Sequence, residues 1–243
     1  MRPRALAATF LAGLFLLFGD DDKALAQSAA AVVDTALVLA VDVSGSVDDN
    51  RYALQMEGIA AAFEDSAVQG TILSGAHGAM LVALVNWSNR PQVAIPWTVI
   101  ASAADAREFA ARVRQAPRLA EDFTCMSAMM QLVADKLVPL MPMPAERTIV
   151  DVSGDGHDNC NPSTPVDSVR DGLVDSGVTI NGLPIRDGNE AATIEGWYRD
   201  HVIGGAAAFL LPADGYKDFG RAIRRKFIIE ISGGGRRPAA SPG

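Results

Sequence analysis

The chain has 243 residues, of which 49% are hydrophobic and 21% are charged. A domain usually takes roughly 100–200 residues, so we expect one domain with a sizeable core rather than a disordered chain. The formal net charge of −8 argues against binding to nucleic acid, which needs a basic surface, and against an anionic membrane surface as a partner.

The N-terminus has the layout of a signal peptide. Arg2 and Arg4 precede an apolar run at 5–18, and the small-x-small pattern at 24–26 predicts cleavage before Gln27. The apolar run is shorter than the roughly 18 residues of a spanning helix. Three aspartates before the cleavage pattern are unusual, so an uncleaved anchor is the alternative. With cleavage, we expect a periplasmic or secreted protein without a membrane span.

Apolar runs and helical periodicities alternate along the rest of the chain. Residues 36–43 form a continuous apolar run, which is typical of a central strand buried on both faces. The short link at 88–91 predicts an antiparallel hairpin between two strands. The predicted strands are 36–43, 80–87, 93–99, 147–152, 178–185 and 207–211. The predicted helices are 52–63, 103–114, 126–137, 165–175, 191–201 and 216–231.

This alternation predicts an α/β fold with a doubly wound, mostly parallel sheet, one antiparallel edge strand and helices on both faces. We find no internal repeat and no interdomain linker. The last residues are rich in Gly, Pro, Arg and Ser, with nothing to bury. We therefore expect a signal peptide at 1–26, a folded domain at 34–232 and a disordered tail at 233–243.

Oxygen-bearing side chains follow two of the apolar strands. Asp42, Ser44 and Ser46 come after the first strand, and Asp155 comes after the predicted fourth strand. Ligands bind at the carboxyl ends of strands in open α/β sheets. Carboxylates and hydroxyls are hard ligands, which suit Mg²⁺, Mn²⁺ or Ca²⁺ better than zinc or copper. Thr124 immediately precedes a predicted helix, which it could cap while still facing this edge.

These three motifs together resemble the metal-ion-dependent adhesion site (MIDAS) of von Willebrand factor type A (vWA) domains. The resemblance covers about residues 34–232 and implies a vWA, Rossmann-like fold. It implies that Ser44, Ser46 and Thr124 reach one cation directly or nearly so, while Asp42 and Asp155 act directly or through water. The run Asp-Val-Ser-Gly-Asp-Gly at 151–156 is also similar to a bacterial exported subgroup of unknown function. Many relatives have glycines around the threonine, whereas this chain has Asp-Phe-Thr-Cys.

The resemblance implies a divalent-cation-dependent adhesion or interaction module. Hydroxyl ligands leave positive charge on the ion, so an open coordination position attracts a carboxylate. The expected cofactor is Mg²⁺ (or Mn²⁺ or Ca²⁺), and the expected partner is a protein that presents Asp or Glu. The first alternative is a metal-dependent hydrolase, although we find no nucleophile elbow, phosphate loop or zinc-binding His pair. The second is a structural domain with a vestigial site, since Asp42 and Ser44 are also common turn residues.

Other conspicuous residues have simpler interpretations. Asp151 lies within a buried strand, where it either accepts a hydrogen bond near the ligands or faces a polar layer. His157 has no second His at ligand spacing, so we interpret it as a surface loop residue. Five large side chains are interpreted as packing residues: Trp87, Trp97, Met126, Met129 and Met130.

Cys125 and Cys160 are the only cysteines. Two cysteines in an exported protein are often paired. If Thr124 and Asp155 share one ion, as the resemblance implies, their loops are neighbours, and a bridge needs Cα atoms about 4.4–6.8 Å apart. We therefore expect a disulfide. The alternative is a core residue at Cys125 and a free surface thiol at Cys160.

Overall fold

The computed structural model describes residues 32–119, 121–160 and 163–233. The predicted signal peptide and nearly all of the predicted tail lie outside the described residues. Within those ranges, no helix combines the length and the apolar character needed to cross a membrane.

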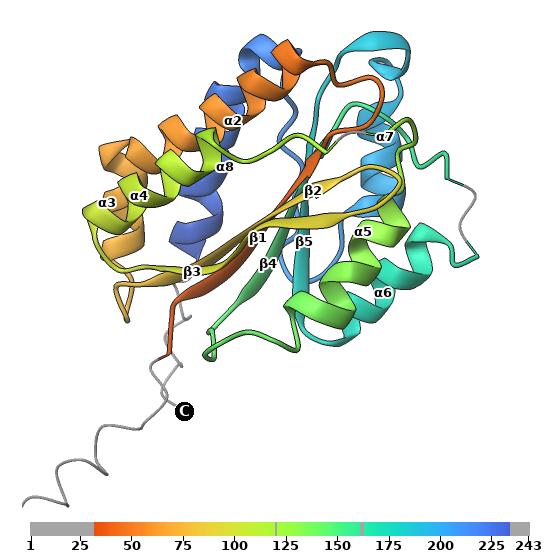
Figure 1. The fold of residues 1–243 in the computed structure, drawn as a ribbon. Coiled ribbons are helices and arrows are strands. Elements are labelled where there is room, and N and C mark those ends of the chain that lie inside the picture. The colour runs from red at the N-terminus through yellow and green to blue at the C-terminus, as the bar shows by residue number, and fades with distance from the viewer. Residues whose placement is uncertain (1–31, 120, 161–162, 234–243) are drawn as a thin grey trace, which may run out of the picture. The chain divides into compact units, whose positions relative to one another are not determined.

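The described strands form one sheet of five, in the order β3-β2-β1-β4-β5 (Figure 1). The strands are β1 (Thr35–Asp42), β2 (Met80–Trp87), β3 (Gln92–Ile100), β4 (Thr148–Gly154) and β5 (Val178–Pro184). Neighbouring strands are parallel except for β2 and β3, which form the antiparallel pair. The predicted mostly parallel sheet with one antiparallel edge strand is therefore confirmed.

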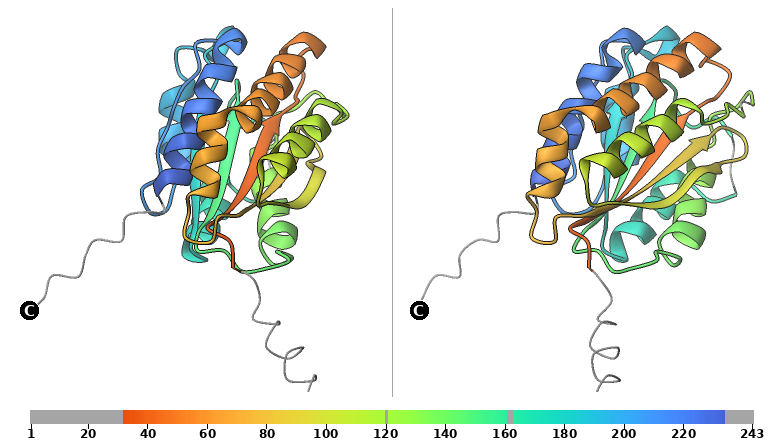
Figure 2. Two further views of the ribbon diagram at one scale, coloured as in Figure 1. Left: turned by 90° about the vertical axis from the view of Figure 1, so that its left-hand side faces the viewer. Right: turned by 60° about the vertical axis from the view of Figure 1, so that its left-hand side comes forward.

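Helices cover both faces of the sheet (Figures 1 and 2). One face carries α2 (Asp49–Glu64), α3 (Ser66–Leu73), α4 (Ala103–Arg114) and α8 (Phe219–Ser232). The other carries α5 (Met126–Leu132), α6 (Val166–Asp175) and α7 (Ile194–Trp197). α5 and α7 continue as short π-helices at Val133–Leu137 and Tyr198–Val202, and 3-10 turns lie at Gly188–Glu190 and Tyr216–Asp218.

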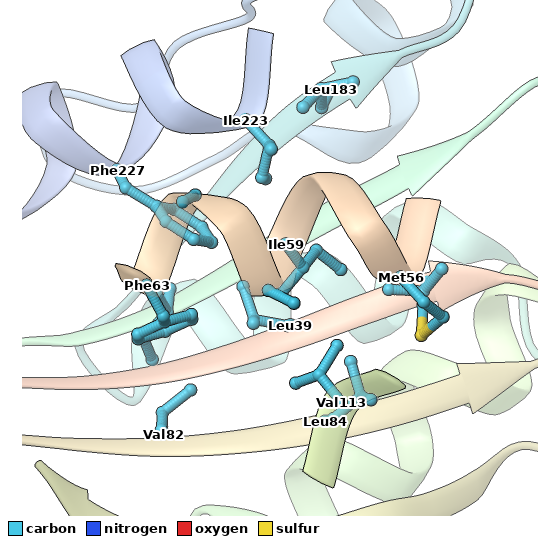
Figure 3. Packing of buried hydrophobic residues seen from close by; sticks show 14 of the residues in the cluster. Leu39, Met56, Ile59, Phe63, Val82, Leu84, Val113, Leu183, Ile223 and Phe227 are labelled. Atoms are coloured by element: carbon cyan, nitrogen blue, oxygen red, sulfur yellow. The ribbon is translucent and has the colours of Figure 1, made fainter. Parts of the chain in front are cut away.

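The core consists of two main layers, one on each side of the sheet. Alternate residues of β1 serve the two layers: Leu39 and Val41 belong to the layer under α2, and Val38 and Ala40 to the layer under α5 and α6. Figure 3 shows part of the first layer, to which β1, α2 and α8 all contribute side chains. Burial on both faces explains the continuous apolar run that predicted this strand.

The five predicted packing residues lie in or against these layers. Four of them are fully buried: Trp87, Met126, Met129 and Met130. Trp97 is partly buried, and its Nε1 donates a hydrogen bond to the carbonyl of Leu137 at 3.0 Å.

One predicted strand is wrong. Residues 207–211 form no strand and make one isolated bridge beside β5, between Gly182 and Leu210. Ala207 has a φ of 57°, in the left-handed region that L-residues seldom adopt, so the backbone turns where the apolar pattern predicted extension. A second difference is α3, which the sequence analysis did not predict.

The chain leaves β1 and β4 toward opposite faces of the sheet. After β1 it forms α2 on one face, and after β4 it forms α6 on the other. β1 and β4 are neighbours, with Val41 paired to Ser153 near their carboxyl ends. Divergence of this kind opens a crevice, which is where ligands bind in open α/β sheets.

Candidate metal centre

The loop after β1 folds back on its own aspartate. Asp42 is the last residue of β1, and its Oδ1 accepts a hydrogen bond from the backbone N–H of Ser44 at 2.8 Å. A side chain at Gly45 would bring Cβ within 3.1 Å of the carbonyl oxygen of Asp122. Any larger residue here would push the Asp122 loop away, so glycine allows the close approach of the two loops.

The predicted ligands after β1 and β4 lie in direct contact. Ser46 Oγ donates a hydrogen bond to Asp155 Oδ1 at 2.6 Å, and the hydroxyls of Ser44 and Ser46 are 3.3 Å apart. Ser46 and Asp155 are 109 positions apart in the sequence. The paired ends of β1 and β4 hold the two loops together.

Backbone and side-chain hydrogen bonds bring the Thr124 loop to the same edge. The backbone N–H of Thr124 donates to Asn159 Oδ1 at 2.8 Å, and the N–H of Asn159 donates to the carbonyl of Thr124 at 3.1 Å. Two residues further on, the N–H of Met126 donates to Asp158 Oδ1 at 2.8 Å. The loop that contains Asp155 thus fixes the start of α5 and the orientation of Thr124.

A disulfide reinforces this connection. Cys125 and Cys160 are bonded, with their Cα atoms 5.0 Å apart. The predicted disulfide is therefore confirmed, and it joins the residue after Thr124 to the loop after β4.

Four of the five predicted ligands line one cavity of about 340 Å³, namely Ser44, Ser46, Thr124 and Asp155. Asp42 is fully buried and does not line this cavity. Its Oδ2 points toward Gly154, where a Cβ would lie 2.8 Å away. Asp42 therefore lies against Gly154 outside the cavity, whereas the other four predicted ligands line it.

The buried carboxylates of this site suit a cation. Among the described residues, Asp42 Oδ2 and Asp155 Oδ2 are buried and accept no hydrogen bond. Burial, and then repulsion from Asp155, raise the pKa of Asp42 to about 7. Burial also raises the pKa of Asp155. A divalent ion would favour the charged forms of both carboxylates and so lower both pKa values. The mixed hydroxyl and carboxylate donors fit Mg²⁺, Mn²⁺ or Ca²⁺.

The donor set is poor in carboxylates and in soft ligands. In the described part of the chain, no group of three or more His, Cys, Asp or Glu side chains is placed to hold a metal ion. A cation at this site would therefore depend on the hydroxyls of Ser44, Ser46 and Thr124.

The cavity also contains charged residues that the sequence analysis did not predict. Arg51, in the first turn of α2, donates from Nη1 to the carbonyl of Ser46 at 2.5 Å and pairs through Nη2 with Asp187 at 2.8 Å. Its Nη1 lies 3.8 Å from Asp155 Oδ2. Glu190 and Asp122 line the same cavity. Asp187 follows β5, so it could have been predicted in the same way as Asp155, from its position after the carboxyl end of a strand. Nothing in the sequence indicates a site role for Arg51, Asp122 or Glu190.

Neither Asp151 nor His157 lines this cavity. Asp151 Oδ1 is 2.7 Å from Lys226 Nζ, and Lys226 also pairs with Glu230, so Asp151 faces a buried polar layer under α8. His157 is partly exposed and stacks on Trp197, with ring centroids 5.1 Å apart. It is the surface loop residue that the sequence predicted.

The described domain has the fold of vWA domains. It matches proximal thread matrix protein 1 (PTMP1) from the mussel byssus, in a structure with a zinc-occupied MIDAS motif, with a TM-score of 0.61 and 12% identity, over 83% of this chain and 47% of that one. It also matches the vWF domain of the type V pili tip protein Mfa5 from Porphyromonas gingivalis, with a TM-score of 0.58 and 11% identity, over 86% and 98% of the two chains.

A third similar structure is the pilus adhesin SpaC from Lactobacillus rhamnosus GG, with a TM-score of 0.59 and 13% identity, over 82% of this chain and 31% of that one. The present chain thus spans about half the length of PTMP1 and about a third of SpaC. Within the vWA fold it belongs to the family described as "Protein of unknown function (DUF1194)", whose model matches residues 32–235. No curated protein matches the sequence significantly.

Proposed function

We propose that this protein is a divalent-cation-dependent protein-binding module. One Mg²⁺, Mn²⁺ or Ca²⁺ ion is held by Ser44, Ser46, Thr124 and Asp155, with Asp42 acting directly or through water. The observation that carries the proposal is the convergence of four oxygen donors from three loops on one cavity, where Asp155 Oδ2 and the nearby Asp42 Oδ2 are buried and have no hydrogen-bond partner among the described residues.

The ion would serve binding because its ligands leave it electrophilic. Three of the five donors are neutral hydroxyls, so the ion keeps positive charge for a further ligand. Ser46 is exposed where it lines the cavity, and an Asp or Glu side chain of a partner could enter beside it. The similar structures from pili and from the byssus support an interaction role of this kind.

The proposed compartment is the periplasm or the cell exterior. The signal peptide predicted at 1–26 and the disulfide between Cys125 and Cys160 both favour export, because disulfides persist in oxidising compartments. Mass spectrometry of the protein from the native envelope should find an N-terminus at or near Gln27. An intact Met1 on cytoplasmic protein would contradict export.

Calorimetric titration with Mg²⁺ and Mn²⁺ tests the metal site. We expect one ion per chain and loss of binding in Asp155→Ala. Asp214→Ala serves as a control, because Asp214 is an exposed carboxylate outside the cavity. Chelation should release a bound partner while the fold persists, since the sheet edge is formed without the ion. Unchanged metal affinity in Asp155→Ala would refute the site, and cooperative unfolding on chelation would indicate a structural ion.

A further inference from the structure

The charges around the candidate metal centre do not cancel. A divalent ion would balance Asp42 and Asp155, and Arg51 already balances Asp187 through their 2.8 Å contact. Two carboxylates that line the same cavity, Asp122 and Glu190, remain.

Neither of these two carboxylates has an arginine or lysine partner among the described residues. The arginines around the Asp122 loop pair elsewhere: Arg90 with Glu121 at 2.5 Å, and Arg118 with Asp49 at 2.8 Å. The Asp122 side chain is exposed, and this residue lines the cavity.

Glu190 is held at the mouth of the site by a backbone contact. Its Oε2 accepts a hydrogen bond from the N–H of His157 at 2.5 Å, and the His157 ring nitrogen Nδ1 lies 3.8 Å away. A Cβ placed on Gly156 would be 3.7 Å from this oxygen and 3.3 Å from Thr124 Oγ1. Glu190 therefore reaches the neighbourhood of a proposed ligand while its side chain stays 43% exposed.

An isolated carboxylate that approached this cavity would meet two unbalanced negative charges beside the ion. If the partner carries a basic group next to that carboxylate, the same two negative charges attract the basic group. The cavity volume of about 340 Å³ leaves room for more than one side chain around the ion.

We infer that the partner presents a basic side chain next to its acidic one, and that this lysine or arginine pairs with Asp122 or Glu190 while the carboxylate binds the ion. The inference rests on the proposed function, which it deepens by naming the charge pattern of the partner. The two carboxylates act as specificity determinants, since they select among acidic segments without holding the metal.

Four blocked pentapeptides test this pattern on the full chain loaded with Mg²⁺, by NMR titration. They are Gly-Asp-Gly-Lys-Gly, its variants with Ala or Glu in place of Lys, and Gly-Ala-Gly-Lys-Gly. We expect the Asp/Lys peptide to bind roughly threefold to tenfold more tightly than the Asp/Ala peptide, in line with one or two exposed ion pairs. The Asp/Glu peptide should bind more weakly than either, and the peptide without Asp should give no Mg²⁺-dependent shift.

The double variant Asp122→Asn/Glu190→Gln should lose the preference for lysine and keep its affinity for Mg²⁺. Glu121→Gln is the matched control: it removes one charge from the same loop but lies outside the cavity, and it should keep the preference.

Equal responses to all four peptides on the Mg²⁺-loaded protein, or a lysine preference that survives in the double variant, would overturn this inference alone. A stoichiometry of two ions that falls to one in the double variant would also overturn it, by assigning the carboxylates to a second cation. Failure of Mg²⁺ to bind at all would overturn the proposed function as well.

Discussion

Ser46 and Asp155 are joined by a 2.6 Å hydrogen bond from a serine hydroxyl to a carboxylate, between loops that follow two different strands. The bond exists because β1 and β4 are parallel neighbours whose carboxyl ends coincide, with Val41 opposite Ser153. It orients one oxygen of Asp155 and leaves the other, Oδ2, without a hydrogen bond among the described residues. The serine can therefore act on a bound ion in two ways, as a ligand and as the group that orients Asp155.

Ser46→Ala should weaken Mg²⁺ binding by roughly tenfold to a hundredfold, the usual effect of removing a group that orients a metal ligand. The thermal midpoint should change little, because Ser46 is exposed and lies outside the core. Ser74→Ala provides a matched control on a distant exposed serine, whose hydroxyl donates only to a backbone carbonyl. Equal Mg²⁺ affinities of Ser46→Ala and Ser74→Ala in calorimetry would show that Ser46 plays no part in the site.

The disulfide should stabilise both the fold and the ligand geometry. Cys125 and Cys160 are 35 positions apart, and the loop-entropy estimate for such a bridge is roughly 3–4 kcal/mol. The double variant Cys125→Ser/Cys160→Ser should lose up to that much free energy of unfolding in urea. It should also bind Mg²⁺ more weakly, because the loop that positions Thr124 gains freedom. Two free thiols in denatured, unreduced protein from an oxidising compartment would contradict the bridge.

The strands that hold the site could be predicted because their burial leaves a simple pattern. β1 and β4 are covered on both faces, so β1 is a continuous apolar run and β4 is mostly apolar apart from Asp151 and Ser153. The positions of Asp42 and Asp155 follow from where these two strands end. The Thr124 loop was harder to place, since its position depends on hydrogen bonds to Asn159 that no local pattern encodes.

Other features could not be predicted because they depend on contacts between distant segments. The pairing of Arg51 with Asp187 spans 136 positions, and no local pattern at either residue indicates the other. The apolar run at 207–211 resembles a strand, yet Gly205 and Ala207 both have positive φ and turn the chain beside β5. Periodicity records which residues are buried, but it does not record such a change of backbone direction.

Glu230 should make stability depend on pH near neutrality. Burial, and then repulsion from Asp151, raise the pKa of Glu230 to about 7, while Lys226 opposes the shift. The folded state therefore binds a proton more tightly than the unfolded state, in which the pKa is about 4.5. The stabilisation is complete below pH 4.5 and is lost as the pH rises toward 7.

Glu230→Gln should remove this loss, because an amide stays neutral throughout. We expect the free energy of unfolding of the variant, minus that of the parent protein, to rise by roughly 1–3 kcal/mol as the pH goes from 4.5 to 7.5. Urea denaturation at each pH measures this difference. Groups such as Asp42 titrate in both proteins, so their contribution cancels when the two free energies of unfolding are subtracted. Glu108→Gln, at an exposed position on α4, should give a flat difference curve. A flat curve for Glu230→Gln as well would show that the buried layer does not titrate in this range.

The contact between α2 and α8 gives a prediction about packing in which two effects oppose each other. Alanine normally stabilises a helix interior by roughly 0.5–1 kcal/mol relative to glycine. At Gly58 in α2, however, a Cβ would lie 2.8 Å from Cδ1 of Phe219 and 3.0 Å from Cα of Gly220. The phenyl ring can turn, but the backbone of α8 can move only by opening the layer shown in Figure 3. Gly58→Ala should therefore destabilise the protein by roughly 1–3 kcal/mol, the usual cost of overpacking.

Gly172→Ala is the matched control for Gly58→Ala. Gly172 lies within α6, and a Cβ there would meet no atom within 4 Å, so only the helix preference acts and the variant should gain roughly 0.5–1 kcal/mol. Opposite signs for the two variants in urea denaturation would show that α2 and α8 touch through their backbones. In the structure, a Cβ on Gly220 would lie 3.5 Å from the Cα of Gly58. A gain in stability at both positions would mean that the backbones of α2 and α8 are farther apart than this contact implies. Because α8 also carries Lys226 and Glu230, such a separation would loosen the buried polar layer too, and the pH dependence of Glu230 would weaken with it.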